Sequence, residues 1–165
     1  MRSTKFWGFA SAALTPFVAM TMLVIGASAV STTTVIYSFS GGADGEYLDT
    51  DLVVDTAGNL YGTTSGGGTS GHGTVYKLDT SGNETVLYSF TGGADGKNPY
   101  AGVIRDSAGN LYGTTYNGGA AGSGVVYKVD ASGHETVLYS FTGGADGGNP
   151  NAGEESPNCT GHGAG

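Results

Sequence analysis

Hydrophobic and polar residues alternate along most of this chain in short runs, and this pattern predicts β-strands. One run places Val86, Tyr88 and Phe90 on the same face, and a second does so for Val125 and Tyr127. A two-residue period puts every second side chain on one side of a sheet. The intervening positions are also partly apolar, so we expect each sheet to be covered on both faces.

The pattern returns after 51 residues, which identifies a tandem repeat. Residues 35–85 can be laid over 86–136 without a gap, and 30 of 51 positions are identical. A partial third copy follows at 137–153. Each complete copy predicts four short strands, at 51–55, 59–64, 73–79 and 84–90 in the first and at 102–106, 110–115, 124–130 and 135–141 in the second.

Two hairpin turns in each copy share an Asp-x-x-Gly pattern that explains how these strands are joined. An aspartate carboxylate accepts hydrogen bonds from backbone N–H groups two residues further on, and the glycine takes the positive φ that closes the hairpin. We therefore assign a structural role to the turn residues Asp55, Gly58, Asp79, Gly82, Asp106, Gly109, Asp130 and Gly133.

The repeat unit is typical of a β-propeller blade. Propeller blades have four antiparallel strands, periods of this length and neighbours on both faces. We predict an all-β fold with about two complete blades and a partial third, preceded by an N-terminal signal helix. A stacked β-solenoid is the alternative, although its coils are usually shorter.

Two motifs carry a family resemblance. Asn-Leu-Tyr-Gly-Thr-Thr occurs at 59–64 and 110–115, and Gly-Gly-Ala-Asp-Gly occurs at 41–45, 92–96 and 143–147. With these motifs the chain resembles the GloVer tandem repeat of exported bacterial proteins, over about residues 35–153. The resemblance implies a secreted or surface-displayed, propeller-like protein with variable surface anchors, and it brings no catalytic residues.

Residues 1–29 have the features of a secretory signal peptide. The basic residues Arg2 and Lys5 precede an apolar stretch at 6–26, and Ala27-Ser28-Ala29 fits a cleavage site. We therefore predict export to the medium, the cell surface or the periplasm, with a repeat region at 30–153. An uncleaved membrane anchor is the alternative, because the apolar stretch is long enough to span a bilayer.

Charge and composition after residue 29 exclude several kinds of partner. This part has four basic and 14 acidic residues, a net charge of −10, which repels nucleic acids and anionic membranes. Scarce charge, at 12% of residues, together with 32 glycines favours sheets with tight turns over disorder. The single cysteine, Cys159, excludes an internal disulfide.

The tail at 154–165 departs from the repeat. Deletion of one base from suitable codons for Asn-Leu-Tyr-Gly-Thr would give its Asn-Cys-Thr-Gly-His, at 158–162, and our hypothesis is that a frameshift produced this tail. We interpret the chain as a truncated piece of a longer repeat protein. Because two units and a partial third cannot close a ring, we expect either self-association that completes a propeller or a fragment of marginal stability.

Candidate binding chemistry is sparse. Asp44, Asp95 and Asp146 recur in the Gly-Gly-Ala-Asp-Gly motif and are calcium candidates, although each motif supplies only one carboxylate. Tyr100 and Tyr116 are candidates for stacking on a sugar. We predict no cofactor, because the glycine run at 66–71 precedes a strand and a dinucleotide site requires a helix there.

These observations predict an exported structural module that binds an extracellular protein or a glycan and is not an enzyme. The repeat offers no nucleophile with a base and an orienting group. The alternative is a piece of a secreted hydrolase or lyase whose catalytic residues lie in missing blades.

Overall fold

The computed structural model describes residues 32–48 and 50–151. From Thr34 onward these residues belong to one compact unit. The predicted signal peptide and helix at 1–29, its cleavage site and the tail at 154–165 lie outside the described residues. In the described part, no helix is present that could cross a membrane.

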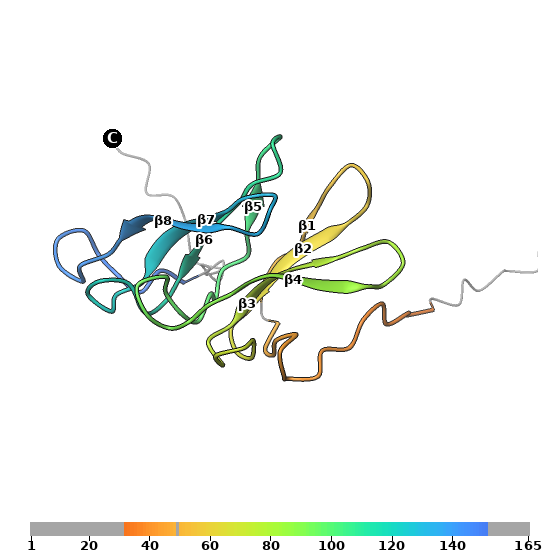
Figure 1. Ribbon diagram of the computed structural model, residues 1–165, viewed down its shortest axis with the longest axis horizontal. Helices are drawn as coiled ribbons and strands as arrows, with labels where there is room; N and C mark the ends of the chain where they lie inside the picture. Colours follow the sequence, from red (N-terminus) through yellow and green to blue (C-terminus); the bar gives the residue numbers. More distant parts are fainter. Residues whose placement is uncertain (1–31, 49, 152–165) are drawn as a thin grey trace, which may run out of the picture. The chain divides into compact units, whose positions relative to one another are not determined.

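The described residues form two four-stranded antiparallel sheets, which confirms the all-β prediction (Figure 1). Sheet 1 has the order β1-β2-β3-β4 and sheet 2 has the order β5-β6-β7-β8. The strands of sheet 1 are β1 (Val53–Val54), β2 (Leu60–Thr64), β3 (Thr74–Leu78) and β4 (Glu84–Ser89). Those of sheet 2 are β5 (Ile104–Arg105), β6 (Leu111–Thr115), β7 (Val125–Val129) and β8 (Glu135–Ser140).

The edge strands β1 and β5 are shorter than the predicted 51–55 and 102–106. Only two residues of each pair with the neighbouring strand. The next residue, Asp55 or Asp106, already belongs to the hairpin turn, where its backbone N–H donates to the carbonyl of Asn59 or Asn110. Turn formation therefore ends the ladder earlier than the sequence pattern indicates.

Both sheets contain a bulge at the same repeat position. In sheet 1, Val75 lies opposite Tyr88 and Tyr76 lies opposite Val86, so Leu87 is the additional residue. The register of β7 and β8 shifts at the equivalent point, between Val126 and Tyr127. A bulge increases the local twist of a strand pair. The repeated sequence thus produces the same twisted ladder twice.

The hydrophobic core lies between the two sheets. Phe90 follows β4 and packs edge-to-face on Tyr127 of β7, with ring centroids 5.0 Å apart. The buried members of this cluster are Tyr61, Val75, Phe90, Val103, Leu111, Val125, Tyr127 and Val129. Since residues from both sheets and from their connection share one core, each sheet covers an apolar face of the other.

The connection at 90–103 is bound to both sheets. On the side of sheet 1, the backbone N–H of Phe90 donates to the carbonyl of Gly73 at 3.0 Å. The Thr63 hydroxyl donates to the carbonyl of Ala101, also at 3.0 Å. On the side of sheet 2, Lys97 pairs with Asn117 through reciprocal backbone hydrogen bonds. These bonds fix how the second sheet follows the first.

Gly96 in this connection provides a test of the packing. Its φ is +93°, and a Cβ there would lie 2.7 Å from the Cγ2 methyl of Thr115 on β6. We expect Gly96→Ala to lower the free energy of unfolding by about 2–4 kcal/mol, because the new methyl is strained and overlaps a packed side chain. Chemical denaturation followed by circular dichroism measures this change.

Gly93→Ala is the matched control for that substitution. The nearest atom to a Cβ at Gly93 is the Thr91 Oγ1, at an ordinary contact distance of 3.6 Å. We expect a change of well under 1 kcal/mol. Equal destabilisation by the two variants would contradict the close packing of Gly96 against β6.

Candidate functional site

The predicted turn residue Asp55 is a hydrogen-bond acceptor at the centre of its hairpin. Its Oδ1 accepts from the backbone N–H groups of Ala57 and Asn59, each at 2.9 Å. Its Oδ2 accepts from the Asn59 side-chain amide at 2.9 Å and from the Tyr61 hydroxyl at 3.0 Å. These hydrogen bonds, above all that of the Asn59 side chain, lower the pKa of the Asp55 carboxyl to about 2.

The three other turn aspartates also accept hydrogen bonds from residues of their own hairpins, with different side-chain donors. Asp79 accepts from both the backbone and the side chain of Asn83, and Asp106 does so from Asn110. Asp130 accepts from the hydroxyl of Ser132 and from two backbone N–H groups. Each carboxyl pKa is lowered, chiefly by the side chain that donates to it. The four turn glycines, at 58, 82, 109 and 133, have φ between +84° and +89°.

The calcium candidates Asp44, Asp95 and Asp146 each hold the loop in which they lie. In every copy the carboxylate accepts from a tyrosine hydroxyl seven residues earlier. It also accepts from the backbone N–H and the hydroxyl of the serine or threonine four residues earlier. Both carboxylate oxygens are therefore occupied by donors from the same loop.

No cluster of His, Cys, Asp and Glu side chains surrounds these aspartates in the part of the chain that the structure describes. Across residues 32–48 and 50–151, no three His, Cys, Asp or Glu side chains gather as a metal site. A calcium ion prefers six to eight oxygen ligands. The observed hydrogen bonds give these aspartates a structural role in the loop.

The two candidate ligand-binding tyrosines lie together, although 16 positions separate them in the sequence. The rings of Tyr100 and Tyr116 meet edge-to-face, with centroids 5.4 Å apart and an interplanar angle of 70°. Both side chains are half-buried. Tyr100 belongs to the connection between the sheets and Tyr116 follows β6, so the pair lies where the connection meets sheet 2.

Asn98, Asn117 and Asn149 form hydrogen bonds to one another or to the backbone of Tyr116, and the sequence analysis did not identify them. The carbonyl of Asn98 accepts from the backbone N–H of Tyr116 at 3.0 Å. The Asn117 side-chain amide donates to the Asn98 Oδ1 at 3.3 Å, and the Asn149 amide donates to the carbonyl of Tyr116 at 2.9 Å. We call Asn98, Tyr100, Tyr116 and Asn117 the junction cluster.

A signal for the junction cluster was present in the repeat alignment. The first copy has Tyr47 where the second has Asn98, and it has Ser65 and Gly66 in place of Tyr116 and Asn117. Tyr116 and Asn117 occur in only one of the two complete copies, whereas Asn98 recurs in the partial third copy as Asn149, which makes the equivalent hydrogen bond. Comparison of the two copies at positions of difference would therefore have found the cluster.

Two glutamates are half-buried at the start of the last strand of each sheet. Glu84 begins β4 and Glu135 begins β8. Burial raises the pKa of both carboxyls, and the nearby carboxylates of Asp44 and Asp95 raise it further. Because the two glutamates occupy the same position in different sheets, their environment follows from the repeat.

The turn aspartates predict how stability depends on pH. The Asp55 carboxyl has a folded pKa near 2, below the value of about 3.9 for an unfolded chain. Its charge therefore stabilises the fold above about pH 4, and this contribution is lost as the pH falls towards about 2. We expect Asp55→Asn to lower the melting temperature at pH 7 and to have little effect near pH 2.

Thermal melts followed by circular dichroism at several pH values measure this difference. Asp51→Asn is the control, because Asp51 is exposed and its carboxylate accepts no hydrogen bond within the described residues. A melting-temperature difference for Asp55→Asn that stays constant from pH 7 to pH 2 would contradict a role for the ionised carboxylate.

The chain matches the model of a known repeat family. No curated protein matches the sequence. The family described as Gloeobacter/Verrucomicrobia repeat matches residues 19–162, which include both sheets, the connection and the junction cluster. The resemblance to this repeat that the motifs indicated is confirmed. With its two copies of one ladder and this match over most of its length, the chain belongs to the Gloeobacter/Verrucomicrobia repeat family.

Proposed function

We propose that this chain is an exported structural module that binds a glycan through the junction cluster and does not turn it over. The observation that carries the proposal is the edge-to-face pair of Tyr100 and Tyr116, together with the hydrogen bonds that Asn98 makes to Asn117 and to the backbone of Tyr116. This combination occurs once, whereas the surrounding fold occurs twice. Export is supported by the sequence features of residues 1–29.

The chemistry of the junction cluster is suited to a sugar. The apolar C–H face of a pyranose packs on aromatic rings, and tyrosine adds a hydroxyl that reaches the polar rim of the ligand. An asparagine amide has two N–H donors and an acceptor oxygen with two lone pairs. The single hydrogen bond from the Asn117 amide to the Asn98 Oδ1 leaves part of this capacity for sugar hydroxyls.

The cluster is held rigidly enough to act as a preorganised site. Asn98 has a φ of +55° and donates from its side chain to the carbonyl of Ser65 at 3.0 Å. Its backbone N–H donates to the carbonyl of His72 at 2.9 Å. Asn98 thereby ties the site to sheet 1, while Tyr116 belongs to the loop after β6. A ligand then binds with little additional ordering of the chain.

The same proposal describes the two sheets as blades of a propeller. Three observations support this description: antiparallel four-stranded ladders, a shared core between their faces and a bulge at the same position in each. Propellers carry their binding sites in loops and connections of this kind, and the blades serve as scaffold.

The test is co-sedimentation of the purified full chain with insoluble cellulose, xylan and chitin. We expect retention on at least one of them, and we expect Tyr116→Ser to weaken it about tenfold, or ~1.4 kcal/mol. Serine is the residue that the first copy has at this position. The variant therefore keeps a side chain that the repeat already accommodates.

Tyr47→Asn is the matched control for the binding test. It also replaces a tyrosine by the residue found at the same position of the other copy, and Tyr47 is 64% exposed with a φ of 60°. Asparagine tolerates a positive φ better than tyrosine does, so this variant folds at least as well. An equal loss of retention in Tyr47→Asn and Tyr116→Ser would overturn the proposed site. So would the absence of any retention of the unmodified chain. Release of soluble sugar would overturn binding without turnover.

A further inference from the structure

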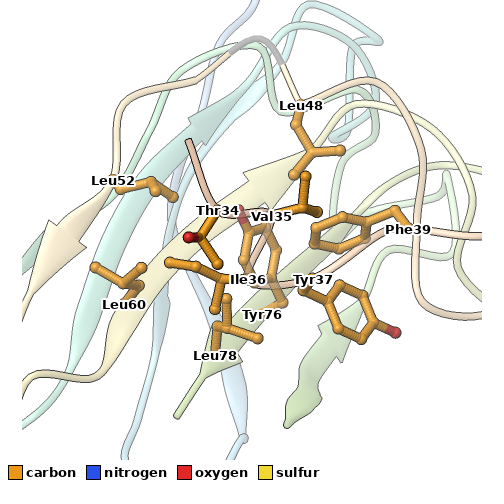
Figure 2. A pocket seen from close by; sticks show the side chains of 10 residues that line it. All are labelled: Thr34, Val35, Ile36, Tyr37, Phe39, Leu48, Leu52, Leu60, Tyr76 and Leu78. Carbon is orange, nitrogen blue, oxygen red and sulfur yellow. The ribbon is translucent and has the colours of Figure 1, made fainter. Parts of the chain in front are cut away.

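An apolar cavity of about 290 Å³ opens on the face of sheet 1 that points away from sheet 2. Figure 2 shows its side chains converging from three directions: the segment 34–39, the residues before β1, and strands β2 and β3. The lining includes Val35, Ile36, Phe39, Leu52, Leu60 and Tyr76. Several of these are exposed, with Ile36 at 58% and Leu52 at 52%.

Comparison with the next repeat shows that this cavity corresponds to the core between the two sheets. Moving its lining residues forward by 51 positions gives residues of the core between the sheets. Phe39 becomes Phe90, and Leu52 becomes Val103, which is only 3% exposed. The ring contact is also repeated, since Phe39 packs on Tyr76 at 4.9 Å as Phe90 packs on Tyr127 at 5.0 Å. The cavity is therefore one half of an interface between two sheets.

The surface that would complete this interface is the outer face of sheet 2. In the complete interface, Tyr61 and Val75 of sheet 1 cover the core and are themselves 7% and 0% exposed. Their counterparts in sheet 2 are Tyr112 and Val126, which are only half-buried. Leu138, on the neighbouring strand β8, is 51% exposed. The outer face of sheet 2 thus carries the residues that the cavity lacks.

The segment 34–39 provides a second, independent observation. Residues 34–45 match 136–147 at ten of 12 positions, and 136–140 belong to the fourth strand of sheet 2. Yet 34–39 form no ladder with any described strand. The segment has the sequence of a fourth strand and packs its Phe39 on sheet 1, but its own sheet is absent from the described part of the chain. A strand edge of this kind favours pairing with another chain.

We propose that sheet 2 of a second copy of this chain covers the cavity, with residues 34–39 taking the place of β8 as the fourth strand of that sheet. The register of β7 with β8 then gives the new pairs. Because Lys128 lies opposite Thr136 and Tyr127 lies opposite Val137, Lys128 meets Thr34 of the other copy and Tyr127 meets Val35. The contact between copies continues the geometry of the contact between sheets 1 and 2.

Strand exchange preserves the pairing of β7 with a fourth strand, and it adds the contact between the cavity and the outer face of sheet 2. Since 34–39 and 136–141 differ only at Ile36 and Leu138, the ladder to β7 is formed by the same side chains in both cases. What is gained is the burial of Tyr112 and Val126 against the cavity, and apolar burial is the main favourable term in association. The contact is head-to-tail, because different faces of the two copies meet. Such contacts add copy after copy, and they give a closed ring when the rotation between copies closes and an open filament when it does not.

Disulfide trapping between two different variants of the full chain tests the strand exchange. Both variants carry Cys159→Ser; one adds Lys128→Cys and the other adds Thr34→Cys. Directly opposed residues of antiparallel strands have Cα atoms about 4.5–5.5 Å apart, which is within disulfide range. We expect the mixed and oxidised variants to give a covalent dimer, detected by mass on a non-reducing gel.

The control mixture replaces Thr34→Cys by Thr80→Cys, since Thr80 is also exposed and lies in the turn after β3. We expect at least tenfold less covalent dimer from it. A single chain with Lys128→Cys and Thr136→Cys reports the β7–β8 pair and gives an internal disulfide. Equal dimer from the Thr34 and Thr80 mixtures, or none from either, would overturn the proposal.

Light scattering of the full chain tests the docking of the two faces separately. We expect masses that are multiples of the 16.4 kDa chain or of its processed form. Val126→Asp should give a folded monomer, because Val126 is half-buried on the outer face, whereas its counterpart Val75 is fully buried. Circular dichroism checks that this variant is folded. A monomeric unmodified chain at all concentrations, or a folded Val126→Asp variant that still oligomerises, would overturn the proposal.

Because this inference does not use the tyrosine pair, its failure and the failure of glycan binding are distinguishable. Tyr116→Ser lies outside the faces that meet and leaves the oligomer unchanged. Val126 lies outside the junction cluster. We therefore expect Val126→Asp to leave the affinity of each chain for the polysaccharide unchanged.

Discussion

The packing of one apolar sheet face on another is the constraint on which the rest of this structure depends. Each ladder has apolar residues on both faces, so neither sheet is stable as a single layer in water. Phe90 lies at the centre of this contact, where it leaves β4 and packs on Tyr127 of the next sheet. The contact brings the junction cluster together, and its unfilled counterpart at Phe39 and Tyr76 forms the open cavity.

The connection between the sheets fixes the position of the second repeat unit relative to the first. Its backbone bonds to Gly73 on one side and to Asn117 on the other leave little freedom for the second sheet. Gly96 allows the close approach to β6, and Asp95 holds the loop through Thr91 and Tyr88. Asp95, which resembles a metal ligand in the sequence, thus takes part in spacing the sheets. This role explains why the motif recurs once per unit.

Differences between the copies carry the functional information, because identical positions are already explained by the fold. Asn98, Tyr116 and Asn117 replace Tyr47, Ser65 and Gly66, and they converge beside Tyr100. A binding site at the junction of two units needs only a few substitutions on an unchanged scaffold. The proposed glycan site and the proposed contact between copies use separate surfaces of that scaffold. The first is the junction cluster, and the second consists of sheet faces that recur in each unit.

The sequence by itself determined the all-β class, the period of 51, the four strands of each unit and the Asp-x-x-Gly turns. These features depend on local hydrogen bonds and on a two-residue period, which nearby residues specify. It also pointed to Tyr100 and Tyr116 as single residues. Only the tertiary structure decided that the two rings touch, that Asn98 bonds to Asn117 and to the backbone of Tyr116, and that segment 34–39 has no partner strand among the described residues. Those facts depend on how one sheet packs on the next, and residues far apart in the chain fix that packing through long-range contacts.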